Sequence, residues 1–255
     1  MPSLTKEVMK RLDRGATIGI IGGGQLGQMM ALSARYMGFH TVVLDPTPGC
    51  PAAGACNQQV IADYDDKEAI RSIAQMSDIL TYEFENVDAD ALDSVRDIVR
   101  IPQGTDLLRV TQNRVAEKTF INNHGIETAR WQEVSSFAQL EKAVEVIGLP
   151  AVLKTAEGGY DGHGQKVLRT ADDVQSVHEQ WGENFEQSVL EGFVNFEYEA
   201  SILVSGNGSE YVTFPVVKNN HVNNILHTTV APAYGAHPSA LDEQVNKQAH
   251  ELART

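Results

Sequence analysis

The fold of this chain is decided by Lys154-Thr155-Ala156-Glu157-Gly158-Gly159-Tyr160-Asp161-Gly162-His163-Gly164-Gln165. Apolar runs at 151–153 and 167–168 flank this segment, and each is typical of a strand. Four glycines in seven residues leave a backbone that can lie against a polyphosphate and offer it N–H groups. Lys154, at the end of the first strand, is placed to reach the same phosphates. The composition is equally typical of a glycine-rich hairpin turn that binds nothing.

The segment departs from the P-loop motif. Gly159 and Gly164 have the P-loop spacing, but Gln165 stands where that motif has lysine, and a strand follows instead of a helix. If the segment binds phosphate, it does so between two antiparallel strands.

Composition and charge exclude several classes of protein. The chain has 255 residues, 42% hydrophobic and 21% charged, which suits two modest globular domains. A net charge of −14 argues against binding to nucleic acid or to an anionic membrane surface. Cys50 and Cys56 are too few for a disulfide framework or a four-cysteine metal site. With neither a signal peptide nor an apolar run of membrane-spanning length, we expect a cytoplasmic protein.

The first part of the chain has the pattern of a dinucleotide-binding unit. A predicted strand at 17–21 leads through Gly22-Gly23-Gly24-Gln25-Leu26-Gly27 into a helix that runs to about Met37, and a second strand ends at Asp45. The pattern favours a cofactor pyrophosphate at the helix start, with the acid on a ribose. The alternative is a glycine turn of the kind that many doubly wound folds share, with a different anion or none.

A predicted strand at 79–82 places Glu85 and Asn86 at its carboxyl end, where open parallel sheets bind small substrates. Asp88 is predicted instead to cap the helix that begins near Ala89. A strand at 98–102 should close the sheet, and we expect the first domain to end near Gly104.

The second part of the chain becomes richer in antiparallel strands. A helix is predicted over 111–120, with Arg114 and Lys118 one turn apart on one face. Arg114 is a candidate phosphate cation, and the alternative is that the two side chains form a solvated basic edge. From Phe196 the apolar pattern alternates, which predicts strands. Glu197 and Glu199 are typical of an exposed strand face, although Glu199 is also placed to accept hydrogen bonds from ribose hydroxyls.

In order and spacing, these motifs resemble the N5-carboxyaminoimidazole ribonucleotide synthases, a family of ATP-grasp enzymes. The resemblance covers almost the whole chain, and its most specific parts are residues 159–165 and Glu83-Phe84-Glu85-Asn86. It implies an α/β protein with three regions: a Rossmann-like parallel-sheet (pre-ATP-grasp) domain at 1–104, an α+β ATP-grasp lid domain at 105–195, and an incomplete second ATP-grasp subdomain at 196–255.

The family makes carboxyphosphate from ATP and bicarbonate with Mg2+, and passes the carboxyl group to the amine of 5-aminoimidazole ribonucleotide; a homodimer is also implied. Catalytic roles would fall to Lys154, Tyr160 and Asp161. Contacts to the ribonucleotide would fall on Gln25, Leu26, Glu85, Tyr160 and Asp161. Contacts to ATP would fall on Arg114, Lys154, Gly159, Tyr160, Asp161, Gly162, His163, Gly164, Gln165, Glu191, Gly192, Phe193, Val194, Glu199 and His221.

One departure from the family affects the expected activity. The family's Mg2+-binding glutamate and further substrate contacts lie beyond Thr255, so no metal ligand is assigned here and we expect a fragment that turns over little or nothing. Two other interpretations stay open: an NAD(P)-dependent oxidoreductase that uses the first glycine turn, and a non-catalytic nucleotide-binding module.

Overall fold

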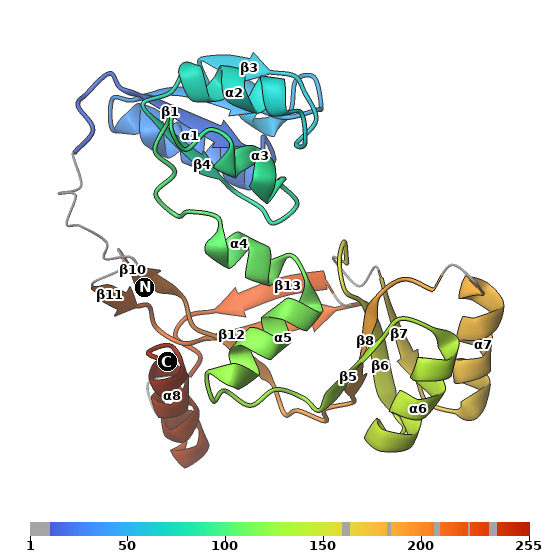
Figure 1. Cartoon of the computed structure of the whole chain (residues 1–255). Coiled ribbons are helices and arrows are strands. Elements are labelled where there is room, and N and C mark those ends of the chain that lie inside the picture. The colour runs from blue at the N-terminus through green and yellow to red at the C-terminus, as the bar shows by residue number, and fades with distance from the viewer. Residues whose placement is uncertain (1–10, 160–163, 183–184, 207–209, 224, 235–238) are drawn as a thin grey trace. The chain divides into compact units, whose positions relative to one another are not determined.

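The computed structural model describes residues 11–159, 164–182, 185–206, 210–223, 225–234 and 239–255. The chain divides into two compact units, Met1–Gln112 and Asn113–Thr255 (Figure 1). The division falls later than the expected boundary at Gly104. The reason is that Leu108 is buried in the core of the first unit, and the Gln112 amide donates hydrogen bonds to the backbone carbonyls of Glu85 and Val87.

The first unit contains a parallel sheet with strand order β3-β2-β1-β4. Its strands are β1 (Thr17–Ile21), β2 (His40–Leu44), β3 (Gln58–Val60) and β4 (Ile79–Tyr82). The strand expected at 98–102 is wrong, because only a single bridge forms between Arg100 and Ile79. Pro102 follows closely and has no N–H with which to extend a ladder.

Both faces of this sheet are buried. The helical segments are α1 (Gln25–Tyr36), η1 (Pro51–Gly54), α2 (Lys67–Gln75), α3 (Ala89–Asp93) and α4 (Asp106–Thr111). Ile20 and Val43 share a core with residues of α1 and η1, whereas their neighbours Ile21 and Leu44 share a core with residues of α2 and α3. Successive side chains of a strand point to opposite faces, so this alternation confirms the predicted doubly wound arrangement.

The second unit begins with a helix that the sequence placed incorrectly. The predicted helix over 111–120 is instead interrupted at Asn113, between α4 and α5 (Arg114–Asn123). The Asn113 side chain accepts hydrogen bonds from the backbone N–H groups of Val115 and Ala116. It therefore acts as the N-cap of α5 and fixes the start of that helix.

An antiparallel sheet with order β5-β8-β6-β7 forms the first half of this unit. Its strands are β5 (Trp131–Val134), β6 (Ala151–Thr155), β7 (Gln165–Leu168) and β8 (Ser188–Gly192). One face packs on α6 (Phe137–Ile147) and α7 (Ala171–Trp181), and Leu153 and Leu190 are buried in that core. The opposite face carries Lys154 of β6 and Glu191 of β8.

The rest of the second unit consists of small antiparallel sheets and a helix (Figure 1). Its elements are β9 (Glu199–Ser201), β10 (Val204–Gly206), β11 (Tyr211–Thr213), β12 (Val217–Val222), β13 (Ile225–Val230) and α8 (Ala240–Leu252). β11 and β12 are separate strands, because Pro215 lies between them and cannot donate to a ladder. In the described part of the chain, no helix is long and apolar enough to cross a membrane.

Candidate nucleotide-binding site

The glycine-rich segment leaves β6 and returns as β7. Lys154 pairs with Gln165 in the ladder, and the Thr155 N–H donates to the Gly164 carbonyl at 2.8 Å. Gly158 and Gly164 both have a φ of +70°. A Cβ atom on Gly164 would lie 2.5 Å from the Thr155 hydroxyl oxygen, so this position requires glycine for both backbone and space. The predicted site residues Tyr160, Asp161, Gly162 and His163 lie outside the described residues.

The strand register brings Lys154 and Glu191 to the same face of the sheet. Val152 of β6 is paired with Glu191 of β8, and Lys154 lies two residues further along β6. Residues two apart on a strand share a face, and long side chains reach across this diagonal. Leu153 and Leu190 point the other way, into the core beneath α6 and α7.

Glu191 binds two ammonium groups at once. Lys154 Nζ lies 2.9 Å from Glu191 Oε2, and Lys118 Nζ lies 3.2 Å from Oε1. The side chains of Glu191 and Lys118 are only 10% and 13% exposed. A carboxylate this deeply buried is stable only with charge partners, and here the pair of lysines leaves the cluster with a net positive charge.

Arg114 holds the base of the glycine hairpin. Its backbone N–H donates to the Ala156 carbonyl at 2.8 Å, and its Nε donates to the Thr155 carbonyl at 3.1 Å. Its Nη2 donates to the Gly159 carbonyl at 3.4 Å. Arg114 and Lys118 therefore face the sheet from α5, and the solvated basic edge that the sequence left open is wrong.

The carboxyl end of β8 presents backbone and apolar groups. The Phe193 N–H donates to the Pro150 carbonyl, and the residues Phe193 and Val194 are 43% and 53% exposed. The Arg169 guanidinium lies 5.6 Å from the centre of the Phe193 ring. An exposed aromatic ring beside strand-end backbone is suited to packing on a flat heterocycle.

A cavity of about 840 Å³ adjoins β7, β9 and β12. Glu199 and His221 contact each other at its wall through a carboxylate oxygen and Nδ1. Gln165 also lines the cavity and pairs with Lys154 in the β6–β7 ladder. The cavity is therefore adjacent to the cluster formed by Lys118, Glu191 and Lys154. The lining residues are Gln165, Phe196, Glu197, Tyr198, Glu199, Lys218, Asn219, Asn220, His221, Asn223 and Val230.

Tyr198 stays neutral in this wall. Burial raises the pKa of its phenol, and the negative charges of Asp242 and Glu197 raise it further. Lys218 Nζ lies 4.4 Å from the centre of the Tyr198 ring, in a cation–π contact. The ammonium of Lys218 is thereby held at the cavity wall.

The glycine turn of the first unit serves close packing. Gly22 has a φ of +106°, and a Cβ there would lie 2.5 Å from Glu83 Cγ. A Cβ on Gly27 would overlap the Gly22 carbonyl oxygen. These two glycines therefore allow α1 to begin immediately after β1.

Two carboxyl groups surround this turn. The Asp45 carboxylate accepts hydrogen bonds from the Gly23 N–H at 2.8 Å and from the Tyr64 hydroxyl at 2.7 Å. Burial raises the pKa of Asp45, but the hydrogen bonds from Tyr64, Thr47 and Gly23 outweigh it and lower the pKa overall. Burial, followed by the charge of Asp45, raises the pKa of Glu83. The Asp45 carboxylate thus accepts a hydrogen bond from the turn, and the two carboxyl groups disfavour the binding of a pyrophosphate there.

The predicted substrate residues Gln25, Leu26 and Glu85 share one edge of the sheet. Gln25 and Leu26 open α1 directly after β1, Glu85 follows β4, and all three are exposed. β1 and β4 are paired in parallel, so their carboxyl ends meet at this edge. Asp88 caps α3 as predicted, because its side chain accepts from the N–H groups of Asp90 and Ala91.

Comparison with known families agrees with this division of the chain. Residues 15–112 match the ribonucleotide synthetase preATP-grasp domain, and residues 119–255 match the ATP-grasp domain. The chain belongs to the ATP-grasp family.

Among curated proteins, this ATP-grasp chain is similar to N5-carboxyaminoimidazole ribonucleotide synthases. It is 44% identical to that of Bacillus subtilis over 94% of this chain and 61% of the relative. It is 40% identical to that of Brucella melitensis over 96% of this chain and 65% of the relative. The chain therefore spans less than two thirds of the length of these relatives.

Solved structures give the same picture. An ADP complex of an N5-carboxyaminoimidazole ribonucleotide synthetase is 43% identical, with a TM-score of 0.87, and is matched over 95% of this chain and 63% of that one. An Aspergillus clavatus synthase in complex with ADP and 5-aminoimidazole ribonucleotide is 29% identical, with a TM-score of 0.81, over 94% and 62% of the two chains.

Lys118 and Lys218, which lie in the charge cluster and in the cavity wall described above, were not among the site residues that the sequence predicted. Lys118 had a usable signal, because it lies one helical turn from Arg114 and thus on the same face of α5. Lys218 alternates with Asn220 along β12, which indicates a shared face but no contact with Tyr198. That contact depends on the tertiary fold.

The resemblance described above implies Mg2+, whose ligands are carboxylate, carbonyl and water oxygens. Among the described residues, no group of three or more His, Cys, Asp or Glu side chains is placed to hold a metal ion.

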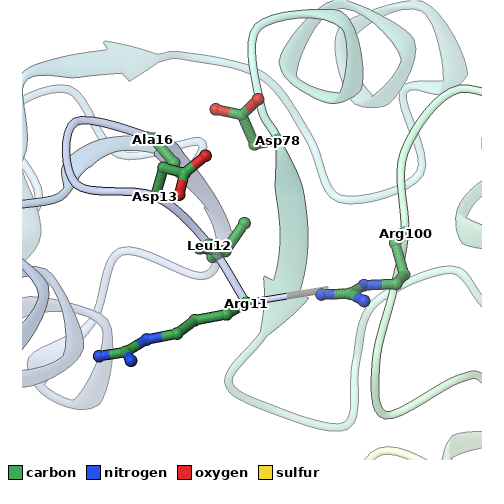
Figure 2. Close-up of a pocket in the computed structure, with 6 residues that line it drawn as sticks. All are labelled: Arg11, Leu12, Asp13, Ala16, Asp78 and Arg100. Atoms are coloured by element: carbon green, nitrogen blue, oxygen red, sulfur yellow. The ribbon is translucent and has the colours of Figure 1, made fainter. Parts of the chain in front are cut away.

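The first unit also has a cavity at its other edge. It has a volume of about 390 Å³ and is lined by Arg11, Leu12, Asp13, Ala16, Asp78 and Arg100 (Figure 2). Ala16 directly precedes β1 and Asp78 directly precedes β4, so the cavity lies at the amino ends of the strands. The Asp78 carboxylate is occupied by the Thr17 N–H at 2.8 Å. The six lining residues include none of the site residues that the sequence predicted.

Proposed function

We propose that this chain supplies the ATP site and part of the substrate site of an enzyme that carboxylates 5-aminoimidazole ribonucleotide. The reaction uses ATP and bicarbonate, and it yields N5-carboxyaminoimidazole ribonucleotide in purine biosynthesis. The observation that carries the proposal is the pairing of Lys154 with Glu191 at the base of a glycine hairpin that Arg114 holds. Similarity to synthases crystallised with ADP supports it.

Each part of the nucleotide has a matching group. Lys154, Arg114 and the N–H groups of residues 159–165 neutralise and bind the phosphates, as charge-assisted donors do most strongly. The backbone of residues 191–194 reads the adenine edge, and Phe193 or Val194 packs on its ring. Glu199 accepts from the ribose hydroxyls, while the contact with His221 fixes its orientation.

The chemistry follows from activating bicarbonate. A bicarbonate oxygen attacks the γ-phosphorus, the bond from that phosphorus to the bridging oxygen of ADP breaks, and carboxyphosphate forms. The amine nitrogen of the ribonucleotide then attacks the carboxyl carbon, phosphate leaves with the electron pair, and the nitrogen loses a proton. Carboxyphosphate hydrolyses readily, so the hairpin with Tyr160 and Asp161 must exclude water while the amine attacks.

The ribonucleotide is assigned to the strand edge that carries Gln25, Leu26 and Glu85, and the family resemblance assigns Tyr160 and Asp161 to the same substrate. The Glu85 carboxylate is exposed and is suited to accept from an amine or a hydroxyl group. The support is the relative crystallised with ADP and 5-aminoimidazole ribonucleotide. We assign the enzyme to the cytoplasm as a homodimer, and sedimentation at micromolar concentration tests its assembly.

Calorimetric titration of the chain with ADP and, separately, with NADH tests the nucleotide assignment. We expect ADP to bind and NADH not to bind, because the cations surround the second glycine segment whereas carboxyl groups surround the first. Binding of NADH in place of ADP would support the oxidoreductase alternative and overturn the proposal. Titration with 5-aminoimidazole ribonucleotide, compared between the original chain and E85Q, tests the substrate edge in the same way.

A further inference from the structure

Lys118 has no role in the function proposed above, yet its environment is unusual for a helix lysine. Its side chain is 13% exposed, and its ammonium lies 3.2 Å from Glu191 Oε1. Lysine on a helix ordinarily keeps its ammonium in water, because burying that charge is unfavourable. The Glu191 carboxylate compensates for this burial.

Glu191 binds its two lysines through separate oxygens. Lys118 of α5 contacts Oε1, and Lys154 of β6 contacts Oε2. The two contacts are geometrically independent, so one ammonium can leave while the other stays. The arrangement differs from a simple ion pair, in which loss of the single partner leaves a buried charge unpaired.

Lys154 has two competing anionic partners once a nucleotide binds. Its ammonium contacts Glu191 at 2.9 Å, and the proposed function requires it to reach the phosphates. With Lys154 as its only partner, Glu191 would oppose this transfer, because its buried carboxylate would lose its compensating charge. Lys118 removes that obstacle by keeping Glu191 paired.

We propose that Lys118 is a positioning residue that retains Glu191, so that Lys154 is available to the nucleotide's phosphates. Lys118 acts through Glu191 and does not itself contact the nucleotide. This inference rests on the proposed function, because it concerns how the same cluster of charges exchanges partners.

A double-mutant cycle between Lys118 and Glu191 tests the proposal. ADP affinity is measured by calorimetry for the original chain, K118M, E191Q and K118M/E191Q. We expect K118M to weaken ADP binding about tenfold when Glu191 is present and less than about twofold when glutamine replaces it. The neutral amide that E191Q introduces does not compete with the phosphates for Lys154. The loss of Lys118 should therefore have little further effect on ADP affinity.

Two further variants separate positioning from folding. K118R keeps a cation on α5 and should retain most of the ADP affinity. K142M removes an exposed lysine from α6 and is the matched control, with no change expected. Thermal unfolding of every variant identifies losses that come from the fold alone.

Each outcome of the cycle decides one question. If K118M weakens ADP binding equally in the original chain and in the E191Q variant, Lys118 either contacts the phosphates directly or supports the fold in general. Either result would overturn the inference. Unchanged affinity in K118M would also overturn it, while leaving the proposed function intact. Failure of the original chain to bind ADP at all would instead count against the proposed function.

Discussion

The two glycine segments of this chain are alike in composition and opposite in surroundings. In the first unit, Asp45 and Glu83 lie against the turn at 22–27. In the second, Arg114 and Lys154 lie at the base of the hairpin at 155–164. Glycine frees the backbone in both places, but the charges beside the backbone differ: carboxyl groups at the first segment and cations at the second.

The difference also shows what each set of glycines is for. Gly22 and Gly27 allow a strand and a helix to approach closely, so they contribute to folding. Gly158 and Gly164 both have a φ of +70°, which glycine adopts without strain, and they lie on either side of the hairpin tip. A glycine pattern in a sequence therefore predicts a turn more reliably than it predicts a ligand.

The strongest way to break the comparison is to remove the cation of the second segment. We expect K154M to weaken ADP binding by about a hundredfold or more, because a charge that meets the phosphates directly is lost. Calorimetry with K142M as the control measures this. An affinity within about twofold of the original would show that Lys154 has no phosphate contact.

Changing a glycine of the hairpin should have a smaller effect on binding. G164A forces a Cβ against the Thr155 hydroxyl at a φ of +70°. We expect ADP affinity to fall about tenfold and stability by about 1–2 kcal/mol. G54A is the control, since a Cβ there meets no atom within 4 Å. Equal behaviour of the two variants would contradict the assigned hairpin geometry.

The corresponding change in the first unit should separate folding from binding. G27A places a Cβ against the Gly22 carbonyl, and we expect a loss of about 1–3 kcal/mol in the unfolding of the first unit. Under conditions in which the chain stays folded, ADP affinity should be unchanged. A loss of ADP affinity without a loss of stability would place the nucleotide at the first glycine segment, which would contradict the proposed site.

The smallest expected effect concerns Glu83. Its pKa in the folded protein is raised by burial and by Asp45, so folding takes up a proton and the ionised side chain destabilises the protein above that pKa. E83Q should therefore raise the melting temperature at neutral pH. The gain should shrink as pH falls through the raised pKa and vanish below the ordinary value of 4.5. Melting curves across this range check the sign, and a gain that grows toward low pH would refute it.

Local patterns in the sequence predicted most of the elements but not their partners. The strands at 17–21 and 79–82 and the Asp88 cap follow from short-range signals, and the structure confirms them. The break at Asn113 was missed, because 111–120 has helical composition throughout and one side-chain cap decides the boundary.

Prediction of the site was limited in the same way. Lys154 and the glycine segment were identifiable because they are contiguous in the chain. The Lys118–Glu191–Lys154 cluster combines a helix and two strands from distant parts of the sequence, and only the β6–β8 register shows that Lys154 and Glu191 share a face. Likewise, the engagement of Asp45 with Gly23 could not be read from a spacing that also fits a ribose ligand.

Hydrogen exchange of the chain with and without saturating ADP tests the central claim most directly. The account predicts slower exchange in peptides covering 154–165 and 188–194, and unchanged exchange in the peptide covering 21–28. Slower exchange at 21–28 with no change at 154–165 would place the nucleotide at the first glycine segment and contradict the account.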